Sequence, residues 1–419
     1  MKIFQLNASY KPAYIYGGPT MSVSKLSEEI SKQGNPIEVV TTSANGPGEL
    51  EVELGKSVLV DGVKVTYYPR ITKDHTHFSP QLLSALARKL KLSKVSNESP
   101  VVHVHAWWNL VSMFSSWIAR WKNIPVILSP RGTLSGYSFT NRNSGLKDYL
   151  HRFLGKGLLE YSYFHVTSEK EKRDIERLVK PKGVFVIPNF VRIPELTPHP
   201  SPSDSSEQVL LKEREKTTPH PDPSDQSEQV LLKEREKNTL RLLFISRVEE
   251  KKGLELLFES LKEFKANWTL DIAGSGEEVY VSKLKSFTEE LGISGGINWL
   301  GHVNNEQKFD VMADHDVMVL PSFDENFANV VIECLSVGTS VLLTRNVGLA
   351  DYVEAKELGW VCERTKDDLL SQLFKISSSR EKIEEIRANA PLIIRKDFNE
   401  EKLVKQYIAM YEEVLRQSK

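Results

Sequence analysis

Short apolar runs and amphipathic stretches alternate along most of this chain. In the first half, apolar runs predict buried strands over Ile37–Thr41, Val101–His105, Val126–Ser129, Tyr163–Thr167 and Val184–Pro188. Between them, apolar residues recur at helical spacing in Ser22–Gln33 and Gln81–Val95. The N-terminal MKIFQLNASYKP combines one Lys, a short apolar run and polar residues, so we interpret it as a first strand and not as a signal peptide.

The same alternation returns in the second half. It predicts strands over Leu240–Ile245, Trp268–Ala273, Ile297–Leu300, Val317–Leu320 and Ser340–Thr344, and helices over Leu254–Phe264, Val279–Leu291, Asn329–Val337 and Lys366–Ile376. Continuous apolar strands are typical of parallel sheets that are covered on both faces. Two such blocks predict an α/β protein with two doubly wound, Rossmann-like domains, which bind ligands outside the carboxyl ends of their strands.

A polar region divides the two blocks. Within it, Thr197–Lys216 recurs as Thr218–Lys237, and both copies contain SEQVLLKEREK. Two copies cannot bury a core, so we interpret the repeat as a duplication inside a weakly ordered linker with short helices at the VLLKEREK pieces. A partner-binding segment remains the alternative. The expected domains are 1–190 and 240–395, with 191–239 as the linker.

The last segment, 396–419, contains one amphipathic helix. Its apolar residues recur at helical spacing along Asn399–Leu415. We expect this face to dock back on the N-terminal domain.

The composition argues against nucleic-acid-binding, disulfide-rich and membrane-spanning proteins. Lys and Arg (55) nearly balance Asp and Glu (56) in the 419 residues, so no basic field predicts nucleic acid as a partner. Two cysteines, Cys334 and Cys362, argue against a disulfide framework and favour the cytoplasm. No run of about 18 apolar residues predicts a membrane span.

The helix predicted over Gln81–Val95 is both apolar and basic, because it carries Arg88, Lys89, Lys91 and Lys94. Two interpretations stay open. The helix packs on a sheet with a solvated basic face, or it makes peripheral contact with an anionic membrane at the inner face of the cell.

The most specific motif is PSFDENFANVVIECLSVGTSVLLTRNVG, Pro321–Gly348, in which seven residues separate Glu325 and Glu333. On one helix the two would lie about 12 Å apart along the axis, which does not suit the carboxyl pair of a retaining glycosidase. We therefore place Glu325 in a loop and Glu333 inside the following helix, so that they contact different parts of one extended ligand. The N–H groups at the start of that helix favour phosphate.

This segment resembles the E-x7-E signature of the glycosyl transferases group 1 family, which are retaining enzymes of GT-B fold. The resemblance implies that Glu325 holds donor sugar hydroxyls and Glu333 the nucleotide ribose. It also implies donor contacts from the backbone of Asn326, Phe327, Ala328, Asn329 and Val330. The family often has Gly where this chain has Ala328, and a positive φ suits Ala less well.

A second motif, Phe244–Gly253, places two cations after a predicted strand. Arg247 and Lys252 can both reach one diphosphate and stabilise it as a leaving group. The motif resembles the family's G-R-x4-K-G element, with Ser246 in place of the first Gly. Lys251 leaves the identity of the second cation open.

Five further positions are expected to line the same cleft. Gly17 and Gly18 follow the first strand and let a phosphate approach the backbone, although the segment lacks the full dinucleotide fingerprint. The resemblance implies that His105 faces the donor sugar and reaction centre. Arg131 is assigned to acceptor contact or a structural role, and Val303, in a strand-end turn, to the border of the nucleobase.

No metal or other cofactor is expected. His103 and His105 share one side of a strand, but no third ligand cluster is apparent. Asp314-His315-Asp316 precedes a strand, whereas the metal-binding DxD of the other major glycosyltransferase fold follows one. Arg247 and Lys252 already supply the charge that a metal would provide.

The resulting hypothesis is a retaining hexosyltransferase, acting from a nucleotide sugar on a saccharide or lipid-linked saccharide. Its expected context is bacterial surface polysaccharide or glycoconjugate synthesis, including lipopolysaccharide or capsule. In this hypothesis residues 1–190 form the acceptor side and residues 240–395 bind the nucleotide sugar. The alternatives are a nucleotide-sugar epimerase of similar architecture and a non-catalytic nucleotide-sugar-binding protein.

Overall fold

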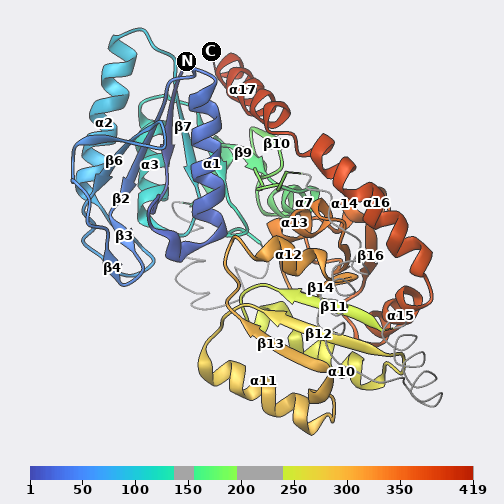
Figure 1. Ribbon diagram of the computed structural model, residues 1–419. Helices are drawn as coiled ribbons and strands as arrows, with labels where there is room; N and C mark the ends of the chain where they lie inside the picture. Colours follow the sequence, from blue (N-terminus) through green and yellow to red (C-terminus); the bar gives the residue numbers. More distant parts are fainter. Residues whose placement is uncertain (136–154, 196–238, 419) are drawn as a thin grey trace, which may run out of the picture. The chain divides into compact units, whose positions relative to one another are not determined.

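The computed structural model describes residues 1–135, 155–195 and 239–418. The duplicated segment and its expected short helices lie outside these residues. The described chain forms two compact units (Figure 1). The first comprises Met1–Val191, Asp324–Asn329 and Phe398–Lys419, and the second comprises Arg192–Phe323 and Val330–Asp397.

The first unit contains an eight-stranded sheet with the order β10-β9-β8-β7-β1-β2-β6-β5. Only β5 is antiparallel to its neighbour. The strands are β1 (Lys2–Leu6), β2 (Ile37–Thr42), β5 (Ser57–Val60), β6 (Val63–Tyr68), β7 (Pro100–His105), β8 (Val126–Ser129), β9 (Tyr163–Val166) and β10 (Gly183–Val186). A small ribbon of β3 (Ala44–Asn45) and β4 (Gly48–Glu49) lies beside them.

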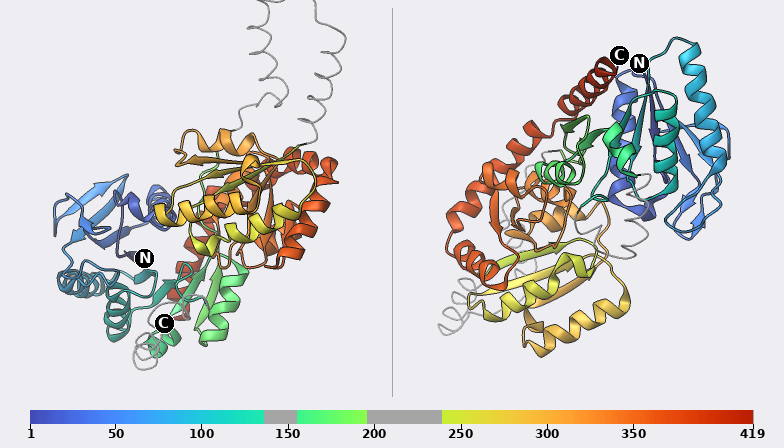
Figure 2. Two further views of the ribbon diagram at one scale, coloured as in Figure 1. Left: turned by 90° about the horizontal axis from the view of Figure 1, so that it is seen from below. Right: turned by 180° about the vertical axis from the view of Figure 1, so that it is seen from behind.

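Helices cover both faces of this sheet (Figure 2). One face packs against α2 (Pro80–Val95), α3 (Leu110–Trp121), α6 (Lys156–Tyr161) and α7 (Glu169–Leu178). The other packs against α1 (Gly18–Lys32), which follows the short η1 (Tyr14–Tyr16), and against α17 (Glu400–Gln417). Neighbouring strand residues serve opposite faces, as Val101 and Val102 do, because side chains alternate along a strand.

The C-terminal helix α17 belongs to the first unit. Its buried side chains are Leu403, Val404, Tyr407, Met410, Tyr411 and Val414, which complete one of the two cores of that unit. Lys25 of α1 forms a 2.9 Å ion pair with Glu400. Helix α17 therefore supplies part of the hydrophobic cover of the first sheet.

The second unit contains a six-stranded parallel sheet with the order β13-β12-β11-β14-β15-β16. Its strands are β11 (Leu240–Ile245), β12 (Trp268–Ala273), β13 (Ile297–Gly301), β14 (Val317–Leu320), β15 (Ser340–Thr344) and β16 (Gly359–Cys362). The surrounding helices are η3 (Glu250–Lys252), α10 (Leu254–Glu263), α11 (Glu278–Glu290), η4 (Ser294–Gly296), α12 (Lys308–Ala313), α13 (Asn329–Ser336), α14 (Ala350–Ala355), α15 (Lys366–Ser377) and α16 (Arg380–Asp397).

The predicted α/β class with two doubly wound sheets is confirmed. The pattern missed the β5–β6 hairpin, β16, α3, α7 and α16. Helix α7 has the sequence EKEKRDIERL, in which most residues are charged, and it buries only Glu171 and Ile175. It therefore has too few apolar residues at helical spacing to be recognised from the sequence pattern.

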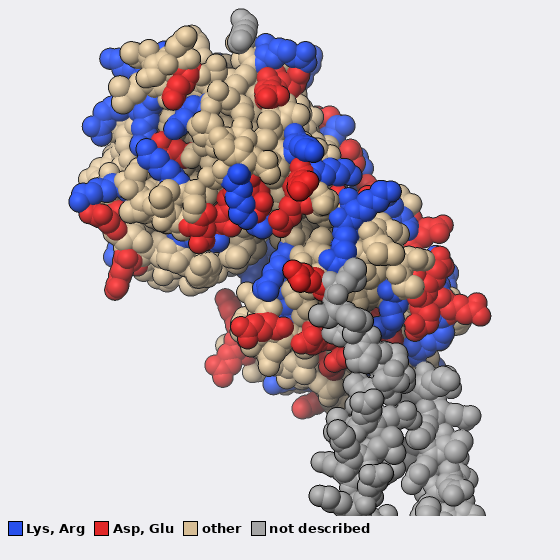
Figure 3. Space-filling view, turned by 45° about the horizontal axis from the view of Figure 1, so that its top comes forward, with Lys and Arg blue, Asp and Glu red and all other residues tan. Residues whose placement is uncertain are grey.

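Surface charge is mixed, in agreement with the net charge of -1: blue and red side chains are interspersed on the face shown in Figure 3. Among the described helices, none combines the length and the apolar character that crossing a membrane requires.

Candidate active site

In the second unit, the strand order reverses between the neighbouring strands β11 and β14. Doubly wound sheets bind ligands at such a point. A hydrogen bond joins the loops that follow these two strands, because the backbone N–H of Phe323 donates to the carbonyl oxygen of Lys251 at 2.8 Å. Gly253 adopts φ 74°, and a Cβ there would lie 2.3 Å from Pro321 O, so this close approach requires glycine.

The two predicted cations follow β11 in different surroundings. The Arg247 side chain is 71% exposed and pairs with Glu249 at 2.6 Å. Lys252 ends η3 and is 6% exposed, whereas Lys251 is partly exposed. Burial therefore distinguishes Lys252 from its neighbour.

Glu333 lies on α13 and has an unpredicted partner. Its Oε1 lies 2.6 Å from Nζ of Lys308, at the start of α12, and both side chains are mostly buried. Val303 lies in the loop between β13 and α12 and is partly exposed, as is Val330 on α13. No sequence spacing marks Lys308 as the partner of Glu333.

The segment Asp324–Asn329 belongs to the first unit. Asp324 accepts hydrogen bonds from Nζ of Lys170 and Oγ of Ser135, both at 2.7 Å. Glu325 follows directly and is partly exposed. The structure thus assigns Glu325 to the first unit and Arg247, Lys252 and Glu333 to the second.

Asn326 anchors the same segment a second time. Its Nδ2 donates to Oγ1 of Thr167 at 2.8 Å, and its carbonyl accepts from Oγ of Ser168 at 3.0 Å. Phe327 is buried, with its ring centroid 6.3 Å from that of Phe398. The two Asn326 hydrogen bonds join residues more than 150 positions apart, which sequence spacing did not reveal.

Ala328 adopts φ 65°, the left-handed conformation that glycine takes without strain. For a residue with a Cβ this costs roughly 1–2 kcal/mol. The concern that the sequence raised about Ala at this position is therefore justified.

A chain of hydrogen bonds links the predicted first-unit residues. Arg131 donates through Nε to Nδ1 of His105 at 3.2 Å and through Nη1 to Oδ1 of Asn189 at 2.8 Å. Asn189 Nδ2 donates to Oδ1 of Asn329 at 3.2 Å, and Asn329 Nδ2 lies 3.4 Å from Oγ of Ser22 on α1. The first unit thus connects His105, Arg131 and Asn329, through an asparagine that the sequence analysis missed.

Gly17 and Gly18 begin α1, after β1 and beside the strand-order reversal between β1 and β7. Gly17 has φ 63°, and a Cβ on either residue would meet no protein atom within 4 Å. Packing alone therefore does not exclude side chains there. By contrast, a Cβ on Gly274, in another strand-end turn, would lie 1.8 Å from Ser246 O.

Two buried histidines form a structural network beside His105. His103 Nδ1 lies 2.7 Å from the Tyr411 hydroxyl, and its Nε2 lies 2.7 Å from Ser129 Oγ. Ser129 Oγ lies 2.6 Å from Nδ1 of His165, whose Nε2 donates to Ile187 O at 2.9 Å. Both nitrogens of each ring are occupied, so this network gives neither histidine a free metal-ligating nitrogen.

Asp316 of the Asp314-His315-Asp316 motif lies among three arginines. The buried Asp316 carboxylate lies 3.1 Å from Nη2 of Arg241, 3.0 Å from Nη1 of Arg380 and 3.4 Å from Nη2 of Arg387. Hydrogen bonds and charge from Arg241, followed by Arg380, hold the pKa of this carboxyl below its usual value despite burial.

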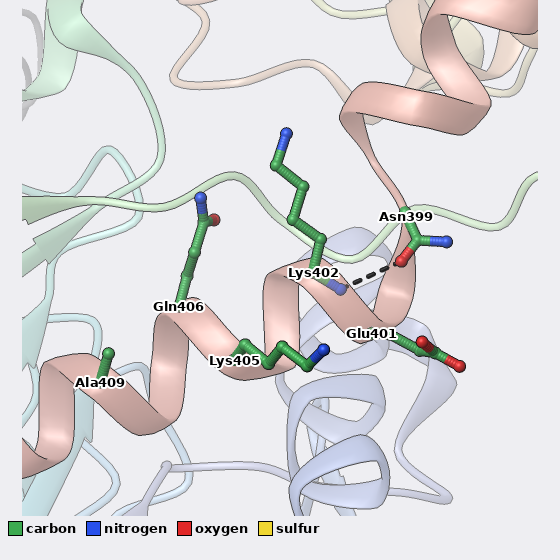
Figure 4. Close-up of a pocket in the computed structure, with 6 residues that line it drawn as sticks. All are labelled: Asn399, Glu401, Lys402, Lys405, Gln406 and Ala409. Atoms are coloured by element: carbon green, nitrogen blue, oxygen red, sulfur yellow. Dashed lines mark hydrogen bonds between the residues drawn. The ribbon is translucent and has the colours of Figure 1, made fainter.

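A shallow hollow on α17 contains none of the predicted site residues (Figure 4). It is lined by Asn399, Glu401, Lys402, Lys405, Gln406 and Ala409. Asn399 caps the helix, because its Oδ1 accepts from Lys402 N at 3.0 Å. The lining residues come from one helix and its cap.

Two family models match this chain in succession. The model described as Glycosyltransferase Family 4 matches residues 16–193, and the model described as Glycosyl transferases group 1 matches residues 225–392. Together with the two doubly wound sheets, these matches define a GT-B glycosyltransferase. The group 1 match lies in the second half of the chain, and the two matches together identify a glycosyltransferase.

Two relatives of this chain have names that describe different glycosyltransferases. The chain is 25% identical over 351 residues to a D-inositol 3-phosphate glycosyltransferase from Xylanimonas cellulosilytica, covering 80% of this chain and 77% of the relative. It is also 25% identical over 186 residues to the putative colanic acid biosynthesis glycosyltransferase WcaL from Salmonella typhimurium, covering 42% and 45%.

Solved structures share the fold over nearly the whole chain. Sucrose-phosphate synthase from Thermosynechococcus elongatus has a TM-score of 0.69 at 17% identity, covering 100% of both chains. HepE from Anabaena, solved in complex with UDP-glucose, has a TM-score of 0.65 at 18% identity, covering 99% of this chain and 100% of that one.

Proposed function

We propose that this glycosyltransferase moves a hexose from a UDP-hexose to a saccharide or lipid-linked saccharide, with retention of anomeric configuration. The observation that carries the proposal is the mostly buried Lys252, placed with Arg247 after β11 and beside β14, where the strand order reverses. Binding of UDP-glucose by HepE supports the choice of donor.

In this proposal the two cations of the second unit bind the donor diphosphate. Burial strengthens the electrostatic interaction of Lys252 with a developing phosphate charge. Arg247 is exposed, so its guanidinium is free to turn from Glu249 toward a ligand. Glu333, held by Lys308, contacts the ribose, and Val303 lies beside the nucleobase.

Chemistry at the anomeric carbon requires a leaving group and a proton acceptor. The C–O bond to the diphosphate breaks, the acceptor oxygen bonds on the same face, and its proton passes to the departing phosphate oxygen. Glu325 and the Asn326–Asn329 backbone hold the sugar. Positive charge comes from Arg247 and Lys252, so we propose transfer without a bound metal.

The decisive experiment separates transfer from its alternatives. The protein is incubated with UDP-, GDP- and ADP-hexoses, with and without a panel of saccharide and lipid-linked acceptors. The proposal is supported if UDP is released only when an acceptor is present and the new glycosidic bond has the α configuration of the donor. Conversion of the donor sugar into its epimer in the absence of an acceptor would indicate an epimerase. Binding of the nucleotide sugar without any turnover would indicate a non-catalytic protein.

The acceptor proposed here belongs to bacterial surface polysaccharide synthesis. The WcaL relative carries a colanic acid role in its name, and WaaG, described as involved in lipopolysaccharide biosynthesis, shares the fold with a TM-score of 0.60 at 14% identity, covering 96% of this chain and 98% of that one. Lipid-linked intermediates of such pathways would require access to a membrane surface.

We also propose peripheral contact with an anionic membrane, through α2 and α3. Neither helix contains an acidic residue, and α2 carries four cations. Leu82, Leu86 and Leu90 of α2 are buried, whereas Leu92 and Val95 are 64% and 76% exposed. On α3, Trp117 and Trp121 are 51% and 72% exposed. Interfacial tryptophans and cations favour such a surface.

Flotation with vesicles tests this contact. The protein should bind vesicles containing phosphatidylglycerol and not pure phosphatidylcholine, and Trp117→Ala with Trp121→Ala should release it. The matched control replaces Tyr14 and Ile15, which are also exposed but lie on η1. Equal binding of both variants would contradict the assignment to α3.

A further inference from the structure

His105 differs from the two buried histidines beside it. His103 and His165 use both ring nitrogens in hydrogen bonds within the first unit. His105 is equally buried, at 1% exposure, yet its Nε2 has no hydrogen-bond partner among the described residues. A buried donor or acceptor without a partner lowers stability, so such a group requires an explanation.

The partner on the other ring nitrogen determines where the His105 proton lies. Arg131 Nε lies 3.2 Å from His105 Nδ1, and a guanidinium can only donate. Nδ1 must therefore carry the lone pair. In a neutral imidazole, the single proton then lies on Nε2.

Charge and burial keep the ring neutral. Burial, the neighbouring His103 and the Arg131 guanidinium lower the pKa of His105 well below 6.5. At neutral pH the ring therefore has one N–H group, and that group is the unpartnered one.

The backbone around the pair is fixed in an unusual conformation. Arg131 adopts φ 51° and Ala106, which follows His105, adopts φ 60°. Such strained residues persist only where the surrounding contacts hold them, and they cluster at functional sites. Asn189 accepts the second Arg131 hydrogen bond, which holds the guanidinium toward His105.

We propose that Arg131 is a positioning residue that fixes His105 as its Nε2–H tautomer, so that the imidazole donates a hydrogen bond to a hydroxyl oxygen of the bound sugar. This inference rests on the proposed function for the identity of the ligand. The tautomer itself is a property of the protein without substrate.

Nitrogen-15 NMR of the histidine-labelled protein measures the tautomer directly. The wild-type His105 signal, assigned with His105→Gln, should show a protonated Nε2 and an unprotonated Nδ1 at pH 7.5. Arg131→Met, which removes the donor at similar length, should shift the signal toward a mixture of tautomers. Arg131→Gln, which restores an N–H donor, should recover the Nε2–H form.

Activity provides the second measurement. Losing one oriented hydrogen bond should lower kcat/KM by about tenfold in Arg131→Met, with partial recovery in Arg131→Gln. The matched control, Arg177→Met, changes an exposed arginine of the same unit and should alter neither measurement. The signals of His103 and His165 report whether the fold is retained.

Two results would overturn the inference: a wild-type His105 protonated on Nδ1, or an Arg131→Met protein whose tautomer equals that of the wild type. Failure of sugar transfer with the expected tautomer shift would reject the proposed function and leave the role of Arg131 intact.

Discussion

The Tyr411 hydroxyl lies 2.7 Å from Nδ1 of His103, which joins the last helix of the chain to strand β7. Because His165 must donate to a backbone carbonyl, the bonds run in one direction, from Tyr411 through His103 and Ser129 to His165. The Tyr411 hydroxyl is therefore the first donor in a buried series of hydrogen bonds that ends at His165.

Tyr411→Phe should lower the free energy of unfolding by about 1–3 kcal/mol, because it leaves Nδ1 of His103 buried without a donor. Urea denaturation measures the change. Tyr14→Phe alters an exposed phenol and should stay within about 0.5 kcal/mol of the wild type. Equal effects of the two changes would contradict the role of the Tyr411 hydroxyl.

Stability should fall as the pH drops below about 6.5. Burial lowers the pKa of His165 to about 3 and those of His103 and His105 well below 6.5. Since the folded-state pKa lies below the unfolded one, the unfolded chain binds more protons between these values. Each group then contributes up to about 1.4 kcal/mol per pH unit.

Urea midpoints at pH 7.5, 6.0 and 5.0 measure this dependence. His103→Gln should flatten the slope, whereas His302→Gln, on an exposed loop, should not. A slope of zero between pH 6.5 and 5 would show that these histidines do not remain neutral in the folded protein.

Asp316→Ala should destabilise the protein by about 3–5 kcal/mol, because it leaves three arginines around a vacated carboxylate position. Thermal unfolding measures the loss. The nearby exposed Asp314→Ala should have little effect. If Mn²⁺ raised the Tm of the wild type but not of Asp316→Ala, a metal role for Asp316 would have to be reconsidered.

Lys252→Met should lower kcat by about 10²–10³, the effect of losing an oriented group that stabilises transition-state charge. The burial difference predicts that Lys251→Met retains activity within a few fold. The Lys251 backbone oxygen, which accepts from Phe323, is kept in that control. If Lys251→Met lost activity and Lys252→Met kept it, Lys251 would be the lysine that binds the diphosphate.

Ala328→Gly should leave stability unchanged or raise it by up to about 1 kcal/mol, because glycine relieves the left-handed φ but costs unfolded-state entropy. The same substitution at Ala388, exposed within α16, should lower stability by about 1 kcal/mol. Differential scanning calorimetry compares the two. A loss of equal size at Ala328 would show that its φ carries no strain.

Hydrophobic periodicity predicted the strands of the second unit closely, and β11, β12, β14 and β15 have the expected bounds. β14 and β15 are buried along their whole length, and β11 and β12 each contain a single charged residue, Arg241 and Asp271, so the apolar pattern is still evident. The contacts of Asp324 and Asn326 with Lys170 and Thr167 span 154 and 159 positions, and periodicity carries no information about pairs so distant. The Arg131–His105 pair could not be predicted either, because it depends on the left-handed turn at Arg131.

The chain leaves the first unit after Val191 and completes it only with Phe398–Lys419. A fragment ending near residue 191 would lack α17 and expose apolar side chains of β1, β2 and β7 to water. During translation, the first sheet must therefore wait for α17 to leave the ribosome before its core closes. A stop codon in α17 would accordingly damage the sheet formed by strands that precede residue 191.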